Sequence, residues 1–246
     1  MGGFFGVASK TDCMVDVFFG TDYHSHLGTR RGGMAAFDEE VGLQRQIHNI
    51  ENSPFRTRFE NIFDEMKGKS AIGCISSMEP QPLLIRSGLG AFAICFIGII
   101  NNADELIERY LSKRSGFFNA MTGGKVNSVE LLAGLISLKE DFTEGIKFAQ
   151  EVIDGTANIL ILKNDGNIIT ARDKMGRLPV IIGKDENGHC VTFESFAAKK
   201  LEYEIIKELG PGEIVEITPE EVVQLSPPLH RWYQRQAKTC PSPTTP

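Results

Sequence analysis

The order of its apolar segments restricts the fold of this chain more than any other feature. Near the start, three short apolar runs predict strands or strand ends: residues 4–7, 14–19 and 32–37. In the middle, three segments have the spacing of amphipathic helices: residues 103–111, 128–138 and 142–153. β-Rich runs separated by turn sequences follow: residues 157–162, 168–171, 179–183, 190–193 and 214–217. Strands, then helices, then strands again predict an α+β fold in which helices pack on two sheets.

Polar residues and glycines mark the ends of the predicted helices. Asn101 and Asn102 precede the first helix as cap candidates, and Ser128 can cap the second. Gly155 follows the third helix as a stop signal. Residues 89–100 form the most apolar run, but two glycines interrupt it and it is far shorter than the roughly 20 residues of a bilayer span. We therefore expect a buried strand there and no membrane helix.

Composition predicts one large domain over residues 1–226. The chain has 246 residues, of which 41% are hydrophobic and 24% charged, so it can build a full core. Hydrophobic periodicity stops after residue 226, and residues 227–246 are expected to form a disordered tail.

The net charge of −6, without a basic stripe, argues against nucleic acid as a partner. The cysteines are odd in number and lack metal-ligand spacing, and no signal peptide is visible. These observations favour the reducing cytoplasm as the location of the protein.

Several short motifs carry a resemblance to a known family. Residues 2–7 read Gly-Gly-Phe-Phe-Gly-Val, and residues 25–33 place a His and several Gly at matching positions. The remaining motifs are Gly98 with residues 101–106, Arg172-Asp173, Gly176, Pro179, Glu194-Ser195 and Pro211-Gly212-Glu213. Each alone is an ordinary turn sequence. In this order they resemble the class II glutamine amidotransferase domain of amidophosphoribosyltransferase, a purine-biosynthesis enzyme, whose mature domain begins Cys-Gly-Ile-Phe-Gly-Val.

This resemblance implies a specific architecture. The family has the N-terminal nucleophile (Ntn) hydrolase fold, a four-layer sandwich of two antiparallel sheets between helices, with the first residue in the active site. In the family a phosphoribosyltransferase domain follows, which makes the whole protein a glycosyltransferase. Residues 227–246 would then be a truncated linker to that missing domain. The expected partner is therefore a phosphoribosyltransferase domain or chain, and a homo-oligomer is left open.

Four positions depart from the pattern that the resemblance implies for glutamine hydrolysis. Gly2 stands in place of the nucleophilic Cys, and Ile97 replaces the Asn of the oxyanion pair, of which Gly98 remains. Ser76 aligns with the segment that supplies an Arg for the substrate carboxylate, and Ser128 with the Asp for the substrate ammonium. The reaction needs a nucleophile, oxyanion donors and partners for both charges. We therefore predict that this chain has no catalytic residue, and no cofactor.

Three cysteines are further candidates for chemistry. Cys13 is a candidate substitute nucleophile, but an apolar-flanked Cys is usually a small buried hydrophobe. Cys74 and Cys95 alternate with apolar residues, as buried strand positions do, and are expected to be structural.

Two pairs of neighbouring polar residues have alternative interpretations. His24 and His26 would share one face of a strand and could bind a metal, but no further ligand has suitable spacing, so we predict no metal site. The resemblance instead gives His26 a structural hydrogen bond. Arg30 and Arg31 lie in a Gly-rich segment and could hold an anion, although adjacent arginines are most often solvated.

Three functions follow as hypotheses. The first is a glutaminase-like domain that is inactive toward glutamine and has a structural or regulatory role in an amidophosphoribosyltransferase-like protein. The second is an active glutamine-dependent amidotransferase, which Gly2 opposes. The third is a non-enzymatic module that binds a small ligand or a partner, for which the apolar pair Phe96 and Ile97 would suit a less polar ligand.

Overall fold

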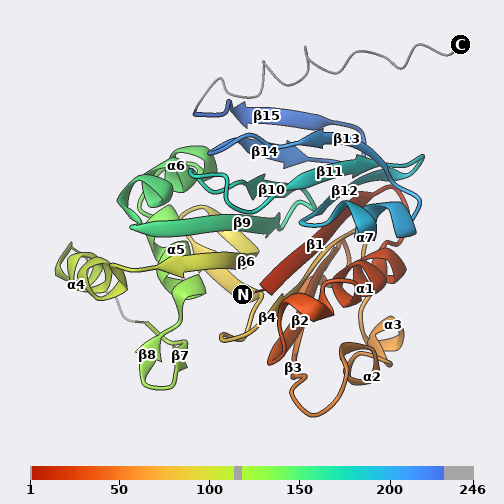
Figure 1. Ribbon diagram of the computed structural model, residues 1–246, viewed down its shortest axis with the longest axis horizontal. Helices are drawn as coiled ribbons and strands as arrows, with labels where there is room; N and C mark the ends of the chain where they lie inside the picture. Colours follow the sequence, from red (N-terminus) through yellow and green to blue (C-terminus); the bar gives the residue numbers. More distant parts are fainter. Residues whose placement is uncertain (1, 114–117, 230–246) are drawn as a thin grey trace, which may run out of the picture.

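Two antiparallel sheets lie face to face in the computed structural model, which describes residues 2–113 and 118–229 (Figure 1). The seven-stranded sheet has the order β13-β11-β12-β1-β4-β2-β3. Its strands are β1 (Gly2–Ser9), β2 (Arg31–Asp38), β3 (Gly42–Asn49), β4 (Ser70–Ser76), β11 (Ile181–Lys184), β12 (Gly188–Thr192) and β13 (Glu204–Glu208). The six-stranded sheet has the order β15-β14-β10-β9-β6-β5. Its strands are β5 (Leu83–Ser87), β6 (Gly90–Ile100), β9 (Gly155–Lys163), β10 (Ile168–Ala171), β14 (Ile214–Ile217) and β15 (Val222–Ser226).

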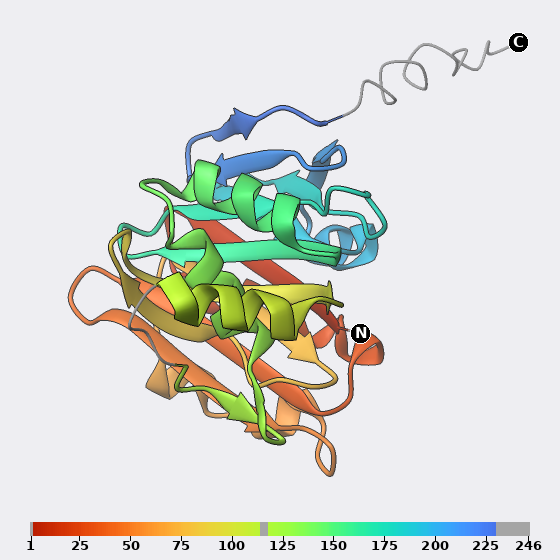
Figure 2. The ribbon, with the colours of Figure 1, turned by 90° about the vertical axis from the view of Figure 1, so that its left-hand side faces the viewer.

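Helices cover the outer face of each sheet. On the seven-stranded sheet lie α1 (Met14–Asp22), α2 (Phe55–Arg58), α3 (Ile62–Glu65) and α7 (Ser195–Lys200), with the 3₁₀ turn η1 (Ser25–Leu27) beside β1. The six-stranded sheet carries α4 (Ala103–Lys113), α5 (Ser128–Ile136) and α6 (Phe142–Val152), which lie in front of the strands in Figure 2. A small hairpin of β7 (Met121–Thr122) and β8 (Lys125–Val126) joins α4 to α5. The expected α+β sandwich of four layers is confirmed.

Strand alternation explains why β1 is apolar throughout. Phe4 and Ala8 point into the core between the sheets, where they meet side chains of the six-stranded sheet such as Leu160. Phe5 and Val7 point to the opposite face and pack under α1. Because both faces are buried, the strand reads as a continuous apolar run and not as an alternating one.

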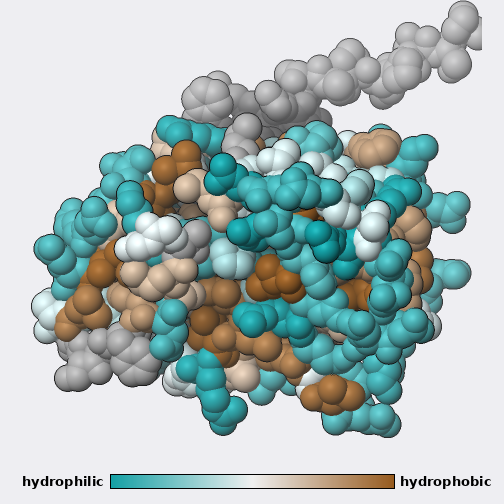
Figure 3. Space-filling view, turned by 90° about the horizontal axis from the view of Figure 1, so that it is seen from below, coloured by the Kyte–Doolittle hydropathy of each residue, from teal (hydrophilic) through white to brown (hydrophobic). Residues whose placement is uncertain are grey.

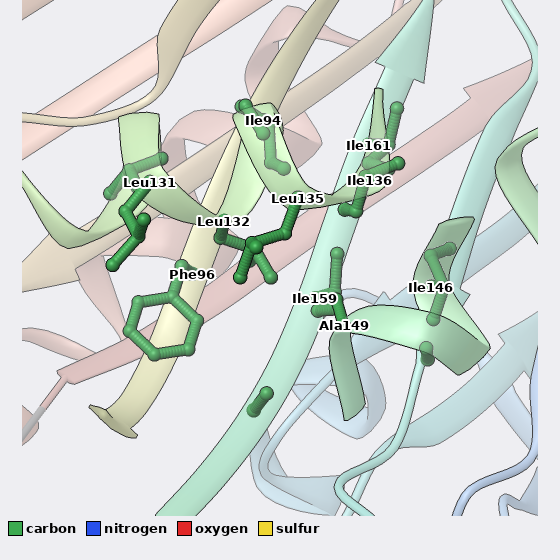
Figure 4. Close-up of a cluster of buried hydrophobic side chains, with 14 of the residues drawn as sticks. Ile94, Phe96, Leu131, Leu132, Leu135, Ile136, Ile146, Ala149, Ile159 and Ile161 are labelled. Carbon is green, nitrogen blue, oxygen red and sulfur yellow. The ribbon is translucent and has the colours of Figure 1, made fainter. Parts of the chain in front are cut away.

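A second core joins the six-stranded sheet to its helices. Leucines and isoleucines of α5 and α6 interlock with Ile94 and Phe96 of β6 and with Ile159 and Ile161 of β9 (Figure 4). Burying one such side chain is worth about 1.5–3 kcal/mol. This packing is the one that the helical spacing of residues 128–138 and 142–153 predicts.

The prediction of a strand at residues 14–19 is wrong, because this segment lies in helix α1. The buried residues Met14, Val17, Phe18 and Thr21 follow helical spacing once the run is extended to position 21. The Asp12 carboxylate accepts the Met14 N–H at 3.1 Å, which favours a helix start. The apolar run alone could not distinguish a buried strand from a short buried helix.

One cap prediction is also wrong. The Asn127 side chain, and not Ser128, caps α5 by accepting the Val129 N–H at 2.8 Å. The Asn102 side chain binds the far end of α6, donating to the Val152 carbonyl and accepting from Asp154 N–H. Both side chains therefore connect elements that are distant in sequence.

The surface mixes hydrophobic patches with hydrophilic side chains, as the view from below shows (Figure 3). None of the described helices is long and apolar enough to cross a membrane. Of the expected tail, residues 227–229 run beside residues 210–212, and Leu229 N–H donates to the Pro211 carbonyl at 2.9 Å. Residues 230–246 lie outside the described part of the chain.

Candidate functional site

One row of residues crosses the end of the seven-stranded sheet. Gly2 of β1 pairs with Ser76 of β4, and Ser76 pairs in turn with Arg31 of β2. Successive residues of a strand face opposite sides of the sheet. Gly2, Ser76 and Arg31 are on the side that faces the six-stranded sheet, as are Phe4 and Cys74 deeper in the core. The structure thus places Gly2 and Ser76, two of the predicted site residues, side by side.

Position 2 has no room for a side chain. A Cβ on Gly2 would lie 2.2 Å from the Ile75 carbonyl oxygen and 3.0 Å from Cδ1 of Ile97. The first contact is with backbone, which cannot turn aside as a flexible side chain can. A nucleophile at this position would therefore require β1 and β4 to move apart.

Ile97 belongs to the core and offers no donor from its side chain. It lies between the sheets, is 5% exposed and reaches Gly2 from β6. Its neighbour Gly98 is required by close packing, since a Cβ there would lie 2.0 Å from the Thr156 carbonyl oxygen. Gly2 and Ile97 therefore meet at one end of the sandwich, and Gly98 follows Ile97 in β6.

An amide does stand opposite Ile97, but it is already bonded. Asn158 of β9 pairs with Ile97 and is fully buried. Its Nδ2 donates to the Ile97 carbonyl at 3.3 Å, and its Oδ1 accepts from Asp173 N–H at 3.1 Å. The Asn158 amide is therefore fixed inside the sheet by its Oδ1 and by one of the two N–H groups of Nδ2.

Glu79 connects the other two predicted positions, Ser76 through its backbone and Ser128 through its side chain. Ser76 Oγ accepts from Met78 N–H and Glu79 N–H, each at 3.2 Å. The Glu79 Oε1 atom accepts from Ser128 N–H at 2.8 Å and from Ser128 Oγ at 3.0 Å. The carboxylate thus binds the N-terminus of α5, where the helix dipole favours negative charge. Burial raises the pKa of Glu79, and the two bonds from Ser128 oppose that shift.

Buried Gln81 and Asn127 fix the loop that carries Glu79. Gln81 Nε2 donates to the Phe96 carbonyl at 3.0 Å, and its Oε1 accepts from Phe96 N–H at 2.7 Å, in the manner of a strand residue. Asn127 Nδ2 donates to the Pro80 carbonyl at 3.3 Å. Ser76 holds the start of the loop, and Gln81 and Asn127 hold its end. Glu79 is therefore positioned between Ser76 and Ser128.

The histidines lie on the opposite face of the sheet from Gly2. His24 and Leu27 pack against Gly3, the neighbour of Gly2 that faces the helices. Both ring nitrogens of His24 are bonded, to the Gly20 carbonyl at 2.7 Å and to Thr192 Oγ1 at 3.1 Å, and burial lowers its pKa.

The exposed His26 contacts Glu194 at 3.1 Å, so this predicted site residue forms a hydrogen bond but is not beside Gly2. Among the described residues no three potential ligands cluster for a metal.

The remaining candidates have local partners. Arg30 forms an ion pair with Glu51 at 3.3 Å, and Arg31 donates to the Arg30 carbonyl. Cys13 lies under α1 in the outer core, and burial raises the pKa of its thiol well above the usual value. Cys74 and Cys95 are buried strand residues between the sheets, as expected. Burial also raises the pKa of Cys95. None of these thiols reaches Gly2 as a substitute nucleophile.

Comparison with known proteins identifies the fold and the family. A family model described as a glutamine amidotransferase domain matches residues 68–201. The chain belongs to this family. Amidophosphoribosyltransferase of Methanocaldococcus jannaschii is 28% identical over 232 residues, which cover 88% of this chain and 47% of that protein. The Bacillus subtilis enzyme is 26% identical over 226 residues, which cover 87% of this chain and 45% of that protein.

A solved structure shows the same architecture. The glutamine phosphoribosylpyrophosphate amidotransferase of B. subtilis, in complex with ADP and GMP, superposes with a TM-score of 0.78 at 25% identity. The match covers 90% of this chain and 48% of that one. The chain therefore spans about half the length of these relatives, and the Ntn-hydrolase fold of the glutamine amidotransferase domain is confirmed.

The sequence did not predict the place of three residues in this site. Arg31 was considered as an anion ligand, but its place opposite Ser76 depends on the register of β2 and β4. Asn158 had no signal, because it lies within an apolar strand. Glu79 had no signal in the sequence, and only the path of residues 77–82 brings its carboxylate to Ser128.

Proposed function

We propose that this glutamine amidotransferase domain does not hydrolyse glutamine and has a structural or regulatory role in an amidophosphoribosyltransferase-like protein. The observation that carries the proposal is the closed space at Gly2, where a Cβ would lie 2.2 Å from the Ile75 carbonyl oxygen. A single substitution can remove a nucleophilic side chain. The lack of room for any side chain at position 2 has a broader cause, because it results from the packing of β1 against β4 and Ile97.

The lost groups are individually large contributors to such a reaction. Removing a nucleophile costs on the order of 10⁶ in rate, and removing one oxyanion donor costs about 10² to 10³. These effects do not add simply, because the groups act together. Gly2 and Ile97 between them remove both contributions.

Glu79 supports the proposal from the substrate side. Ser76 and Ser128 align with the positions that would pair the carboxylate and ammonium of free glutamine, and here they bind the backbone and the side chain of one internal residue. A free amino acid would have to displace these bonds without gaining an Arg or an Asp in return. Loss of such charge-assisted contacts weakens ligand binding strongly.

A direct assay tests the inactivity. The purified chain should release no glutamate from glutamine above a buffer blank, while the B. subtilis relative, assayed in parallel, serves as the positive control. Enzyme-dependent release of glutamate that disappears on thiol alkylation would refute the proposal and point to a cysteine of this chain. Release that alkylation does not affect would refute it as well.

A partner chain is the second part of the proposal. Met78, two residues beyond Ser76, is 71% exposed, and Ile99, two residues beyond Ile97, is 63% exposed. Large apolar side chains at the Gly2 end of the sandwich would suit contact with a second domain. Because the relatives are about twice as long, we infer that a phosphoribosyltransferase domain or chain is that partner.

The partner can be tested by light scattering after size-exclusion chromatography. The chain is mixed with a phosphoribosyltransferase chain encoded in the same genome. A complex should form and should be weakened by Met78→Asp with Ile99→Asp. Val41→Asp is the matched control, because Val41 is 60% exposed in the β2–β3 turn, at the other end of the ladder from Arg31. No complex, or equal effects of both variants, would contradict a partner at this end.

A further inference from the structure

A cleft of about 450 Å³ lies outside the Gly2 site, at the edge of the six-stranded sheet. Its walls are the edge strand β5, the helices α4 and α5, and residues 118–120, and Arg45 of β3 reaches it from the other sheet. Small-molecule sites in proteins occupy roughly 300 to 1,000 Å³. The cleft therefore has the size of a ligand site, and nothing in the glutamine amidotransferase resemblance accounts for it.

The charges around this β5 cleft are unbalanced. Arg45 and Arg86 both line it and are exposed, and within residues 2–113 and 118–229 neither forms an ion pair. Glu130 is the one acidic residue of the described lining, and its carboxylate is already bonded. One oxygen accepts from Asn119 N–H at 2.9 Å and the other from Ala120 N–H at 2.7 Å. The two guanidinium groups are thus available to an anion, for which they offer planar, bidentate donors.

The interior of the cleft is partly aromatic. The rings of Tyr110 and Phe118 lie 5.2 Å apart between centroids, and Leu83 and Ala133 add apolar surface. Ser137 also lines the cleft, and its Oγ is buried without a hydrogen-bond partner in the described residues. The cleft therefore offers an aromatic and apolar wall next to its two arginines.

From these observations we propose that the β5 cleft binds a small aromatic anion, an aromatic carboxylate or an aryl phosphate. The anionic group pairs with Arg45 and Arg86, and the ring packs on Tyr110 and Phe118. An apolar wall with a few convergent polar groups is the usual composition of a small-molecule site. The proposal is independent of the loss of glutaminase activity, because no residue of the Gly2 site lines this cleft.

Titration of the ¹⁵N-labelled chain with phenyl phosphate tests the site by NMR. Amide signals of residues 83–87, 118–120 and 133–137 should shift in a saturable manner. Benzoate should shift the same signals. Inorganic phosphate lacks the ring and benzyl alcohol lacks the charge, so each should bind at least about tenfold more weakly than phenyl phosphate.

Variants separate the proposed contacts from general attraction of anions. Arg45→Gln with Arg86→Gln should weaken phenyl phosphate binding by about tenfold or more. Arg58→Gln with Arg177→Gln removes the same charge from exposed arginines outside the cleft lining and should leave binding unchanged. Unaltered spectra elsewhere in the protein show that each variant is folded. Equal binding by both double variants, equal binding of benzyl alcohol, or shifts confined to other residues would overturn the proposal.

Discussion

The carboxylate of Glu79 accepts hydrogen bonds from both the backbone N–H and the hydroxyl of Ser128, at 2.8 and 3.0 Å. Ser128 is the position at which the family resemblance calls for an acidic residue. A carboxylate is therefore still present at this place in the fold, but it belongs to a different segment, the loop after β4. There it is used for an internal contact, and a ligand meets a helix terminus that is already satisfied.

The charge state of Glu79 should affect stability, which Glu79→Gln can show. Burial raises its pKa in the folded protein above the ordinary value of 4.5. A carboxyl group whose pKa is raised on folding binds its proton more tightly in the folded state, so its contribution to stability is full below pH 4.5 and is lost as the pH rises through the folded pKa. Gln keeps an acceptor for Ser128 without a charge to bury.

The measurement is chemical unfolding of both proteins at pH 4 and pH 7. The free energy of unfolding of Glu79→Gln relative to the unmodified chain should be more favourable at pH 7 than at pH 4. Glu39→Gln, which removes an exposed carboxylate, is the control for the loss of one charge. A difference that is the same at both pH values would mean that the burial of Glu79 does not disfavour its charged form.

Thiol reactivity should confirm that no substitute nucleophile exists. Cys13, Cys74, Cys95 and Cys190 are buried, and burial raises the pKa of Cys13, Cys95 and Cys190. Because thiolates are the reactive form, these groups should be inert in the folded protein. Of the five cysteines, at most one should react with a chromogenic disulfide reagent before denaturation, and all five after it. Rapid reaction of two or more thiols in the native protein would contradict this packing.

The family and the layers of the fold were predictable because they depend on order along the chain. Residues 128–138 and 142–153 carry the helical spacing with which they pack on the six-stranded sheet. The site itself was less predictable, since the neighbour of Asn158 is set by strand register and that of Glu79 by the path of the loop after β4. Residues 14–19 show the limit of periodicity, because a run of five apolar residues interrupted only by Asp16 fits a strand or a helix equally well.

Asn127 should matter more to stability than its neighbour Ser128. Its side chain caps α5 through Val129 N–H and also donates to the Pro80 carbonyl, and the residue is fully buried. Asn127→Ala should lower the free energy of unfolding by about 1 to 2 kcal/mol. Ser128→Ala leaves the backbone bond to Glu79 in place and should cost less. Denaturant unfolding of the two variants checks this order, and a larger effect of Ser128→Ala would restore the original assignment of the cap.

Restoring a thiol at position 2 should fail to restore activity. In Gly2→Cys the new Cβ would lie 2.2 Å from the Ile75 carbonyl oxygen, so β1 must shift away from β4. Overpacking of this kind costs about 1–3 kcal/mol. Even a correctly placed thiol would have no amide donor from the Ile97 side chain and no charged partner at Ser76 or Ser128. We expect a lower melting temperature and no glutamate release from this variant.

Gly88→Cys is the matched control for this experiment. Gly88 lies in the β5–β6 turn, where an added Cβ meets no atom within 4 Å. The same chemical change should therefore leave stability within about 0.5 kcal/mol of the original value. Thermal unfolding and the glutaminase assay are run on both variants. If Gly2→Cys were as stable as Gly88→Cys, the space at Gly2 would be open to a side chain. Steady glutamate release by Gly2→Cys would show in addition that charged partners at Ser76 and Ser128 are not needed.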